Sequence, residues 1–172
     1  MSKGLNRDSL LALYDYNAYA NHLTLGVAKE LTEEEFTRKV SPSRESVRGL
    51  LQHMLGVEAS YAAMSEGQEL GFKLEDVMSL DRIQYHWERT EQRQQTLLKS
   101  LGDADVEKQV QVQLIDHSFQ FPLWQLLTQA FVHSTHHRGE LSIVLTELGH
   151  PLPTLDIIIH FAKQSGQEWP WV

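Results

Sequence analysis

The sequence predicts an all-α protein, an antiparallel four-helix bundle that forms a single domain over residues 1–172. Three observations lead to this fold class. Four long segments carry apolar residues spaced three and four apart, which is the period of an amphipathic helix. Only short elements accompany these four segments, and four long amphipathic helices with short extras imply an antiparallel bundle. The chain has no internal repeat or linker, and 172 residues are enough for one domain with a sizeable core.

The composition excludes several classes of protein. A net charge of −8 argues against a nucleic-acid partner, which would need a basic face for the phosphates. Because the chain has no cysteine, disulfides, thiolate metal sites and a cysteine nucleophile are excluded, and His, Asp and Glu remain as strong metal ligands. The start of the chain is polar and no apolar run is long enough to span a membrane. We therefore expect a cytoplasmic protein with no membrane partner.

The first helix is expected over residues 8–31, with Asp8 or Ser9 as its cap. Its inward stripe includes Asn17 and Thr24, and two polar residues at such positions indicate an unusual core. A polar connection then leads to the second helix.

The second helix is expected from about Ser43 to Gly67, with one core stripe made of Val47, Leu50, Met54, Val57, Tyr61 and Met64. His53 lies at the edge of this stripe. Glycine inside a helix costs about 1 kcal/mol relative to alanine, so Gly49 and Gly56 on the His53 face require a reason. Clearance around His53 for an ion and a small ligand is one reason, and close packing with His53 on the rim is another.

The third helix is expected over residues 80–101, with a thin apolar stripe and a broad solvated face. Alternation with period two follows within residues 110–121 and predicts a small β-hairpin, with an exposed His117 at its turn. The last long helix comes next, and Thr154 is expected to cap a short final helix over residues 155–164.

The last long helix, expected over residues 123–148, carries the most informative motif in the chain. At about 100° per residue, His133 lies within roughly 40° of His137, together with the apolar residues Leu123, Leu126, Ala130, Leu141, Val144 and Leu148. Two imidazoles four apart on one helix face can chelate one metal ion. The alternative is two buried histidines bonded to nearby backbone or carboxylate groups. His136 points about 100° away from His137.

In a bundle, facing helices can bring His53 beside His133 and His137. Three protein ligands leave a fourth position open, which is the catalytic rather than the structural pattern for zinc. A di-iron site is excluded, because it needs Glu-x-x-His on two helices and the chain has this motif only at Glu147–His150, where the helix ends. P-loop, GxSxG and HExxH motifs are absent.

Three segments of the chain resemble the DinB/YfiT-like family of metal-dependent enzymes. Residues 14–21 are similar to the opening helix of that family, and residues 50–58 to its second-helix histidine segment. Residues 133–139 resemble its H-x-x-x-H-R-G segment. The resemblance covers almost the whole length, and the last two segments agree in residue type, spacing and order.

The resemblance implies a four-helix bundle, often dimeric, with one divalent metal ion per chain, zinc or nickel. The metal ligands it implies are His53, His133 and His137. The chain departs from the family at Glu140, where such proteins usually have Gln, and this places a carboxylate about one turn from His137.

Members of this family with known activity are metal-dependent thiol transferases or isomerases, and others resemble amide or ester hydrolases. We therefore expect a detoxifying S-transferase that activates a low-molecular-weight thiol, or water, for attack on an electrophilic small molecule. The alternatives are a non-enzymatic metal-binding or stress-response dimer and a metal-dependent hydrolase. A homodimer is expected from the resemblance, with modest support from apolar tail residues such as Trp169 and Trp171.

Three charged residues lie close to the histidines in the sequence. Glu140 and Glu58 are candidates for orienting a metal ligand, although a surface carboxylate is the preferred interpretation of both. Arg138 is expected in a structural ion pair rather than in contact with a substrate.

Overall fold

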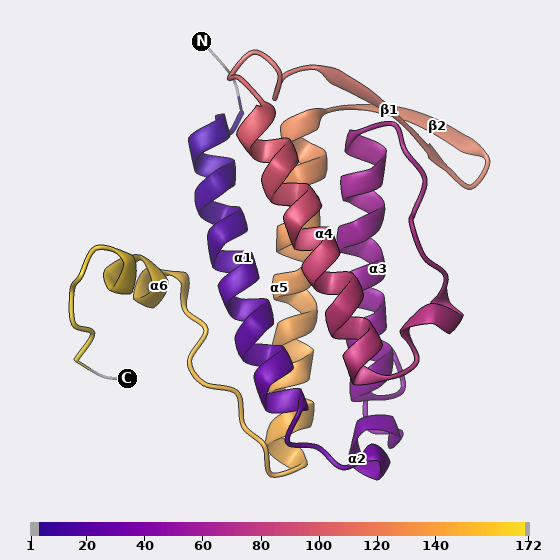
Figure 1. Ribbon diagram of the computed structural model, residues 1–172, viewed down its shortest axis with the longest axis vertical. Coiled ribbons are helices and arrows are strands. Elements are labelled where there is room, and N and C mark those ends of the chain that lie inside the picture. Colours follow the sequence, from indigo (N-terminus) through magenta and orange to yellow (C-terminus); the bar gives the residue numbers. More distant parts are fainter. Residues whose placement is uncertain (1–3, 171–172) are drawn as a thin grey trace.

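The computed structural model describes residues 4–170, which form a bundle of four long helices with a hairpin and short helices attached (Figure 1). The long helices are α1 (Arg7–Ala28), α3 (Val47–Ser65), α4 (Leu80–Ser100) and α5 (Leu123–Glu147). The short elements are α2 (Glu33–Thr37), the 3-10 helix η1 (Leu74–Val77), strands β1 (Gln109–Leu114) and β2 (His117–Pro122), and α6 (Ile157–Gln164). The bundle, the hairpin before the last long helix and the short terminal helix are as predicted.

The directions of the four long helices decide which helices face each other. In Figure 1, α1 and α5 run one way, and α3 and α4 run the other way. The connection over residues 66–79 makes this possible, because it returns along the outside of the bundle before α4 begins. Helices α3 and α5 are neighbours that run in opposite directions, and together they carry the three predicted metal ligands.

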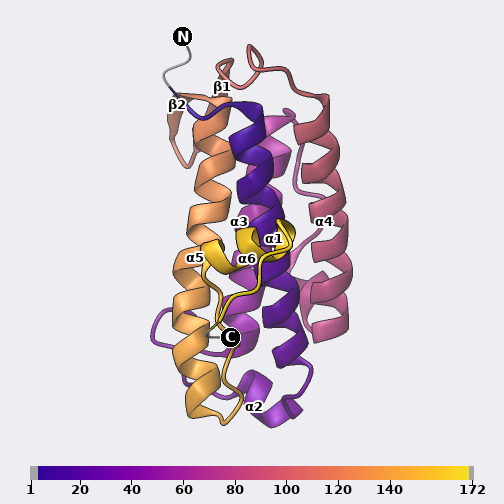
Figure 2. The same cartoon turned by 90° about the vertical axis from the view of Figure 1, so that its left-hand side faces the viewer.

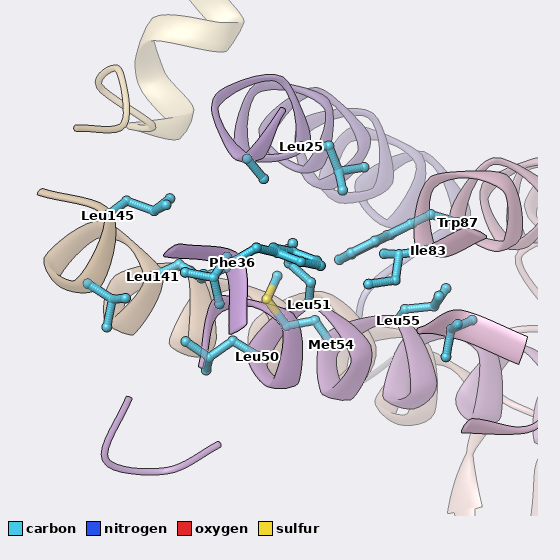
Figure 3. Packing of buried hydrophobic residues seen from close by; sticks show 14 residues of the cluster. Leu25, Phe36, Leu50, Leu51, Met54, Leu55, Ile83, Trp87, Leu141 and Leu145 are labelled. Atoms are coloured by element: carbon cyan, nitrogen blue, oxygen red, sulfur yellow. The ribbon is translucent and has the colours of Figure 1, made fainter. Parts of the chain in front are cut away.

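The larger part of the core lies where α2 closes one end of the bundle (Figure 3). Trp87 of α4 is 1% exposed and belongs to the same cluster as Met54 of α3 and Leu141 of α5. Burying one large apolar side chain contributes about 1.5–3 kcal/mol. This cluster therefore fixes α3 against α5, the two helices on which the predicted site depends.

Helix ends differ from the predicted ones by a few residues. Asn6 caps α1 by accepting from the backbone N–H of Ser9 at 2.8 Å, so neither Asp8 nor Ser9 is the cap. Helix α3 begins only after Ser46, whose hydroxyl accepts from the N–H of Gly49 at 3.1 Å. Both true caps are residues with short polar side chains, so the pattern predicts the type of cap but not its position.

The short elements bring further corrections. Helix α2 lies within the stretch that the sequence suggests is only a polar connection, and Thr32 caps it with a capping box. The hairpin turn falls on Ile115 and Asp116, so the exposed His117 begins β2 instead of forming the turn. Thr154 does not cap α6, which begins at Ile157 after Asp156.

Helix α6 packs outside the bundle, against α1 (Figure 2). The hydroxyl of Tyr16 donates to the backbone carbonyl of Leu155, and Lys163 Nζ donates to the Tyr19 hydroxyl at 3.1 Å. Trp169 is half-buried, and Trp171 lies outside the described residues. None of the helices in residues 4–170 is long and apolar enough to cross a membrane.

Candidate metal centre

Three histidines from two neighbouring helices converge. His53 of α3 meets His133 and His137 of α5, and their candidate ligand atoms all lie within 4.8 Å of one another. The Nε2 atoms of His53 and His133 are 3.0 Å apart, and the three pairs of ring centroids are separated by 4.6–4.8 Å. The structure thus brings together the three residues that the sequence selected, as a cluster able to hold a metal ion.

The buried face of α5 is not centred where the apolar pattern places it. Ser134 and Arg138 are buried along with the leucines, so the centre of the buried face lies about 50° from His137. His137 is 6% exposed and His133 is half-buried, which puts both rings at the edge of the core, facing α3. The predicted stripe is buried but too narrow, because the buried face also includes apolar residues to one side of it, Leu127, Phe131 and Leu145.

The buried face of α3 also differs from the apolar stripe that the sequence predicts. Its predicted stripe continued to Val57, Tyr61 and Met64, but these three side chains are only half-buried. Glu58 and Ala62 are fully buried in their place. The buried face of α3 therefore turns toward a polar centre in the second half of the helix, and His53 is left at its margin.

Glu58 is the middle of this polar centre and is 0% exposed, so its interpretation as a surface carboxylate was wrong. Its two oxygens accept hydrogen bonds from side chains of three other helices. The donors are Asn17 Nδ2 at 3.0 Å, Asn21 Nδ2 at 3.1 Å, Trp87 Nε1 at 3.3 Å and the Ser134 hydroxyl. A buried carboxylate is tolerated only when its acceptors are satisfied in this way. Glu58 therefore joins all four long helices, and its hydrogen-bond partners do not include the three histidines.

Arg138 is 3% exposed and belongs to the same network. Its guanidinium donates to the side-chain carbonyls of Asn17, at 2.9 Å, and Asn21. The two asparagine amides thus connect the Arg138 cation to the Glu58 carboxylate. Arg138 has the structural role that was expected, but through bridging amides instead of a direct ion pair. The polar residue Asn17 on the inward stripe of α1 was the sequence signal for this network.

Glu140 connects α5 to the segment before α3. It accepts from the hydroxyls of Ser41, at 2.6 Å, and Ser43, at 2.5 Å. Its Oε2 atom is 3.7 Å from Nδ1 of His137, and that buried nitrogen has no hydrogen-bond partner among the described residues. A small movement would let Glu140 accept from Nδ1–H and direct Nε2 toward the other two rings, as partners of metal-bound histidines do. The geometry favours an orienting role over a surface carboxylate.

The three imidazoles are in the protonation state that metal binding requires. Burial lowers the pKa of His53 to about 4, with the Arg44 guanidinium and the His137 ring adding to the effect. Burial and the neighbouring imidazoles lower the pKa of His133 to about 4 as well, and burial lowers that of His137. Because only the neutral ring can donate a lone pair to a metal, none of the three has to lose a proton before it binds an ion at neutral pH.

These residues fit a divalent ion. Zinc–nitrogen bonds of about 2.0–2.1 Å in a tetrahedron place two nitrogen ligands about 3.3 Å apart. The 3.0 Å separation of the His53 and His133 nitrogens is close to this value, so small side-chain rotations suffice. The buried Nδ1 atoms of His133 and His137 have no hydrogen-bond partner among the described residues, and buried polar atoms without partners also fit a site that takes up an ion or other ligand.

A surface groove of about 580 Å³ opens beside His53, between α3 and the segments around residues 43–46 and 70–74. The two glycines on this face have different reasons to be glycine. A Cβ atom at Gly49 would lie 2.0 Å from the carbonyl oxygen of Arg44, so Gly49 permits close packing of the preceding segment. Nothing lies within 4 Å of a Cβ at Gly56, which lines the groove and leaves clearance. Close packing thus explains Gly49, and clearance beside His53 explains Gly56.

Metal removal is expected to lower the stability of the fold, because the site requires α3 and α5 to be docked. When free metal is a hundredfold above its dissociation constant, the stabilisation is about 2.7 kcal/mol. Thermal unfolding of the metal-loaded protein, with and without a chelator, measures it. An unchanged melting temperature after chelation would contradict the prediction, provided that metal was present beforehand.

The pH dependence of the same experiment follows from the lowered pKa values. Since the pKa values of His53 and His133 are about 4 in the folded protein, protons should compete with the metal only as the pH approaches that value. In the unfolded chain the imidazoles bind protons with a pKa of about 6.5. The unfolded state thus holds more protons between these values, so stability is present above about pH 6.5 and is lost as the pH falls toward 4.

The fold and the site together define a class of protein: a helical bundle with a three-histidine centre beside an open groove. Within that class, the chain belongs to the DinB family, whose family model matches residues 1–168. No curated protein matches the chain.

Two solved structures show the same fold. A DinB-like protein from Bacillus cereus has a TM-score of 0.69 at 16% sequence identity, with 90% of this chain and 99% of that chain covered. A DinB-like protein from Bacillus subtilis has a TM-score of 0.61 at 19% identity, with 84% and 96% covered. At these identities the likeness concerns the fold, and the chemistry must be argued from the site.

Proposed function

We propose that this protein is a metal-dependent thiol S-transferase that binds one divalent ion, zinc or nickel, at His53, His133 and His137. The observation that supports this proposal best is the convergence of three neutral imidazoles within 4.8 Å at the side of an open groove. Three protein ligands leave one coordination position for a thiol or for water. An ion held there would lower the pKa of the group that takes the fourth position.

The surroundings of the histidines favour a thiol over water as the activated group. Water attack usually also needs a general base within hydrogen-bond reach. Glu140 lies near the site, but both of its oxygens accept hydrogen bonds from Ser41 or Ser43. Glu58 is buried in its own network. A free thiol has a pKa of only about 8.5, so it loses its proton more readily and needs no such base.

The reaction that we propose is balanced without a further reactant. The sulfur of a low-molecular-weight thiol forms a bond to the electrophilic carbon of the second substrate. The leaving group departs with the bonding electrons, and the thiol proton goes to solvent. The groove beside His53 offers space for the electrophile, since Gly56 and Ser60 leave the α3 face open.

The test is a turnover assay on protein purified without a histidine tag. Several small thiols are combined with chromogenic electrophiles, each with and without added zinc or nickel. The proposal expects product only when metal and thiol are both present, and no turnover by His53→Ala. Turnover of esters or amides without thiol would favour a hydrolase, and metal-loaded protein without any turnover would favour a binding or stress-response role.

We further propose that the protein is a homodimer with one complete metal centre in each subunit. Val132 and Ile143 on the outer face of α5 are 58% and 64% exposed, which suits a helix that packs against a second copy. His53, His133 and His137 already meet within one chain, so no ligand needs to come from the partner.

Mixing His53→Ala subunits with His137→Ala subunits tests this arrangement after sedimentation has established the dimer. Complete intrasubunit centres predict no recovery of metal binding in the mixed dimers. Recovery in about half of the sites would show that ligands cross the interface.

A further inference from the structure

Arg44 lies directly against the candidate metal centre. Its Nη2 atom is 3.1 Å from Nε2 of His53, and because a guanidinium can only donate, Nε2 is the acceptor in this contact. The backbone of Arg44 is held in place, since its N–H donates to the Ser41 hydroxyl at 3.0 Å and its carbonyl packs on Gly49. The lone pair that His53 would offer to a metal therefore faces Arg44 as well as Nε2 of His133, which is 3.0 Å away.

The charge of Arg44 has no carboxylate partner among the described residues, and the same holds for Arg48, which lines the same groove. Other arginines of this acidic chain do have one, such as Arg38 with Glu34 at 3.0 Å. Glu45 is the only acidic residue among the described residues that line the groove, and it lies 3.5 Å from Lys39. The groove thus carries two unpaired positive charges in a protein of net charge −8.

The rest of the groove indicates what else a ligand must have. Val57, Leu70 and Leu74 line it, and the last two are 40% and 63% exposed. With a volume of about 580 Å³, the groove has room for a small molecule and not for a macromolecule. A carboxylate joined to a short apolar body matches both the arginines and the apolar lining, because guanidinium and carboxylate pair with two parallel hydrogen bonds.

We propose that the groove binds a small carboxylate with a short apolar body, that Arg44 pairs with the carboxylate, and that this binding strengthens metal binding at His53. This inference rests on the proposed metal centre and names the chemical class of the substrate that the centre serves. A carboxylate that accepts from Arg44 draws the guanidinium away from Nε2 of His53 and neutralises a positive charge next to the cation. The coupling must be reciprocal, so metal also strengthens carboxylate binding.

The experiment measures metal affinity without turnover. Zinc is titrated into the full-length protein against a chromophoric chelator, alone, with hexanoate, or with the neutral isostere hexanamide. Hexanoate is expected to tighten zinc binding about tenfold, and hexanamide to leave it unchanged. Arg44→Met should bind zinc as well as or better than the wild type, with no response to hexanoate. Arg89→Met removes an exposed arginine of α4 outside the groove, and should respond to hexanoate as the wild type does.

Each other outcome overturns the inference. If zinc binds but hexanoate has no effect, the inference fails while the metal centre stands. If hexanoate tightens zinc binding equally in the wild type and in Arg44→Met, the carboxylate ligates the metal directly and Arg44 plays no part. If hexanamide acts like hexanoate, the groove recognises only the apolar body. Protein that binds no zinc under any condition would remove the proposed function and this inference together.

Discussion

Replacing His133 or His137 by alanine is expected to weaken binding of a divalent ion by roughly 10²-fold to 10³-fold. Structural zinc sites with four ligands bind with about 10–16 kcal/mol, so one ligand accounts for roughly 2.5–4 kcal/mol. Elemental analysis and competition titration measure the change. The wild type is expected to hold about one ion per chain, and each variant close to none after dialysis against a weak chelator.

His136→Ala is the matched control for this experiment. His136 is exposed on α5, next to His137 in the chain, and it is not part of the three-histidine cluster. The variant should keep the stoichiometry and affinity of the wild type. Stoichiometric binding by His133→Ala or His137→Ala, or loss of metal from His136→Ala, would refute the assignment of the ligands.

Glu58→Gln is expected to lower the free energy of unfolding by about 3–5 kcal/mol, although the two side chains have almost the same shape. Both oxygens of Glu58 accept hydrogen bonds, from Asn17, Asn21, Trp87 and Ser134. The NH2 group of the glutamine would face side chains that themselves donate hydrogen bonds, so no acceptor would be available for it. The buried Arg138 cation would also lose the negative charge that balances it. Denaturant unfolding at neutral pH gives the difference from the shift in midpoint.

Glu88→Gln is the control for this second experiment, because Glu88 is exposed on α4 and makes a hydrogen bond with Gln84 at 2.8 Å. Its effect should stay within about 0.5 kcal/mol. If Glu58→Gln were as stable as Glu88→Gln, the carboxylate of Glu58 would not be needed to satisfy the network. The prediction is then wrong even though the contacts exist.

The presence of the long helices could be predicted from the sequence, but the residues at which they begin and end could be predicted only approximately. The spacing of apolar residues predicted the four long helices, and the period-two stretch near Val112 and Phe119 predicted the hairpin. The helices that follow Asn6, Ser46 and Asp156 do not start where they were predicted to, because several polar residues near each helix start can serve as a cap. The tertiary contacts of each end select one of them.

The candidate site was predicted in its members but not in its surroundings. His133 and His137 are four apart on one helix, so their side chains must lie close together wherever that helix goes. The burial of Glu58 was not predicted, and the structural role of Arg138 was predicted without its partners, because a charged residue usually lies on the surface. Only partners from other helices, Asn17 and Asn21, make the burial of these two charges tolerable.

The sequence by itself determined the helical bundle, the histidine pair of α5 and the family to which the chain belongs. These features depend on local spacing, which fixes the relative direction of side chains along one helix. The tertiary structure decided which way α4 runs, that the imidazoles lie at the edge of the core, that Glu140 faces His137, and that Arg44 reaches His53. Such contacts join residues far apart in the chain, and they depend on the rotation of each helix about its axis, which packing against its neighbours selects.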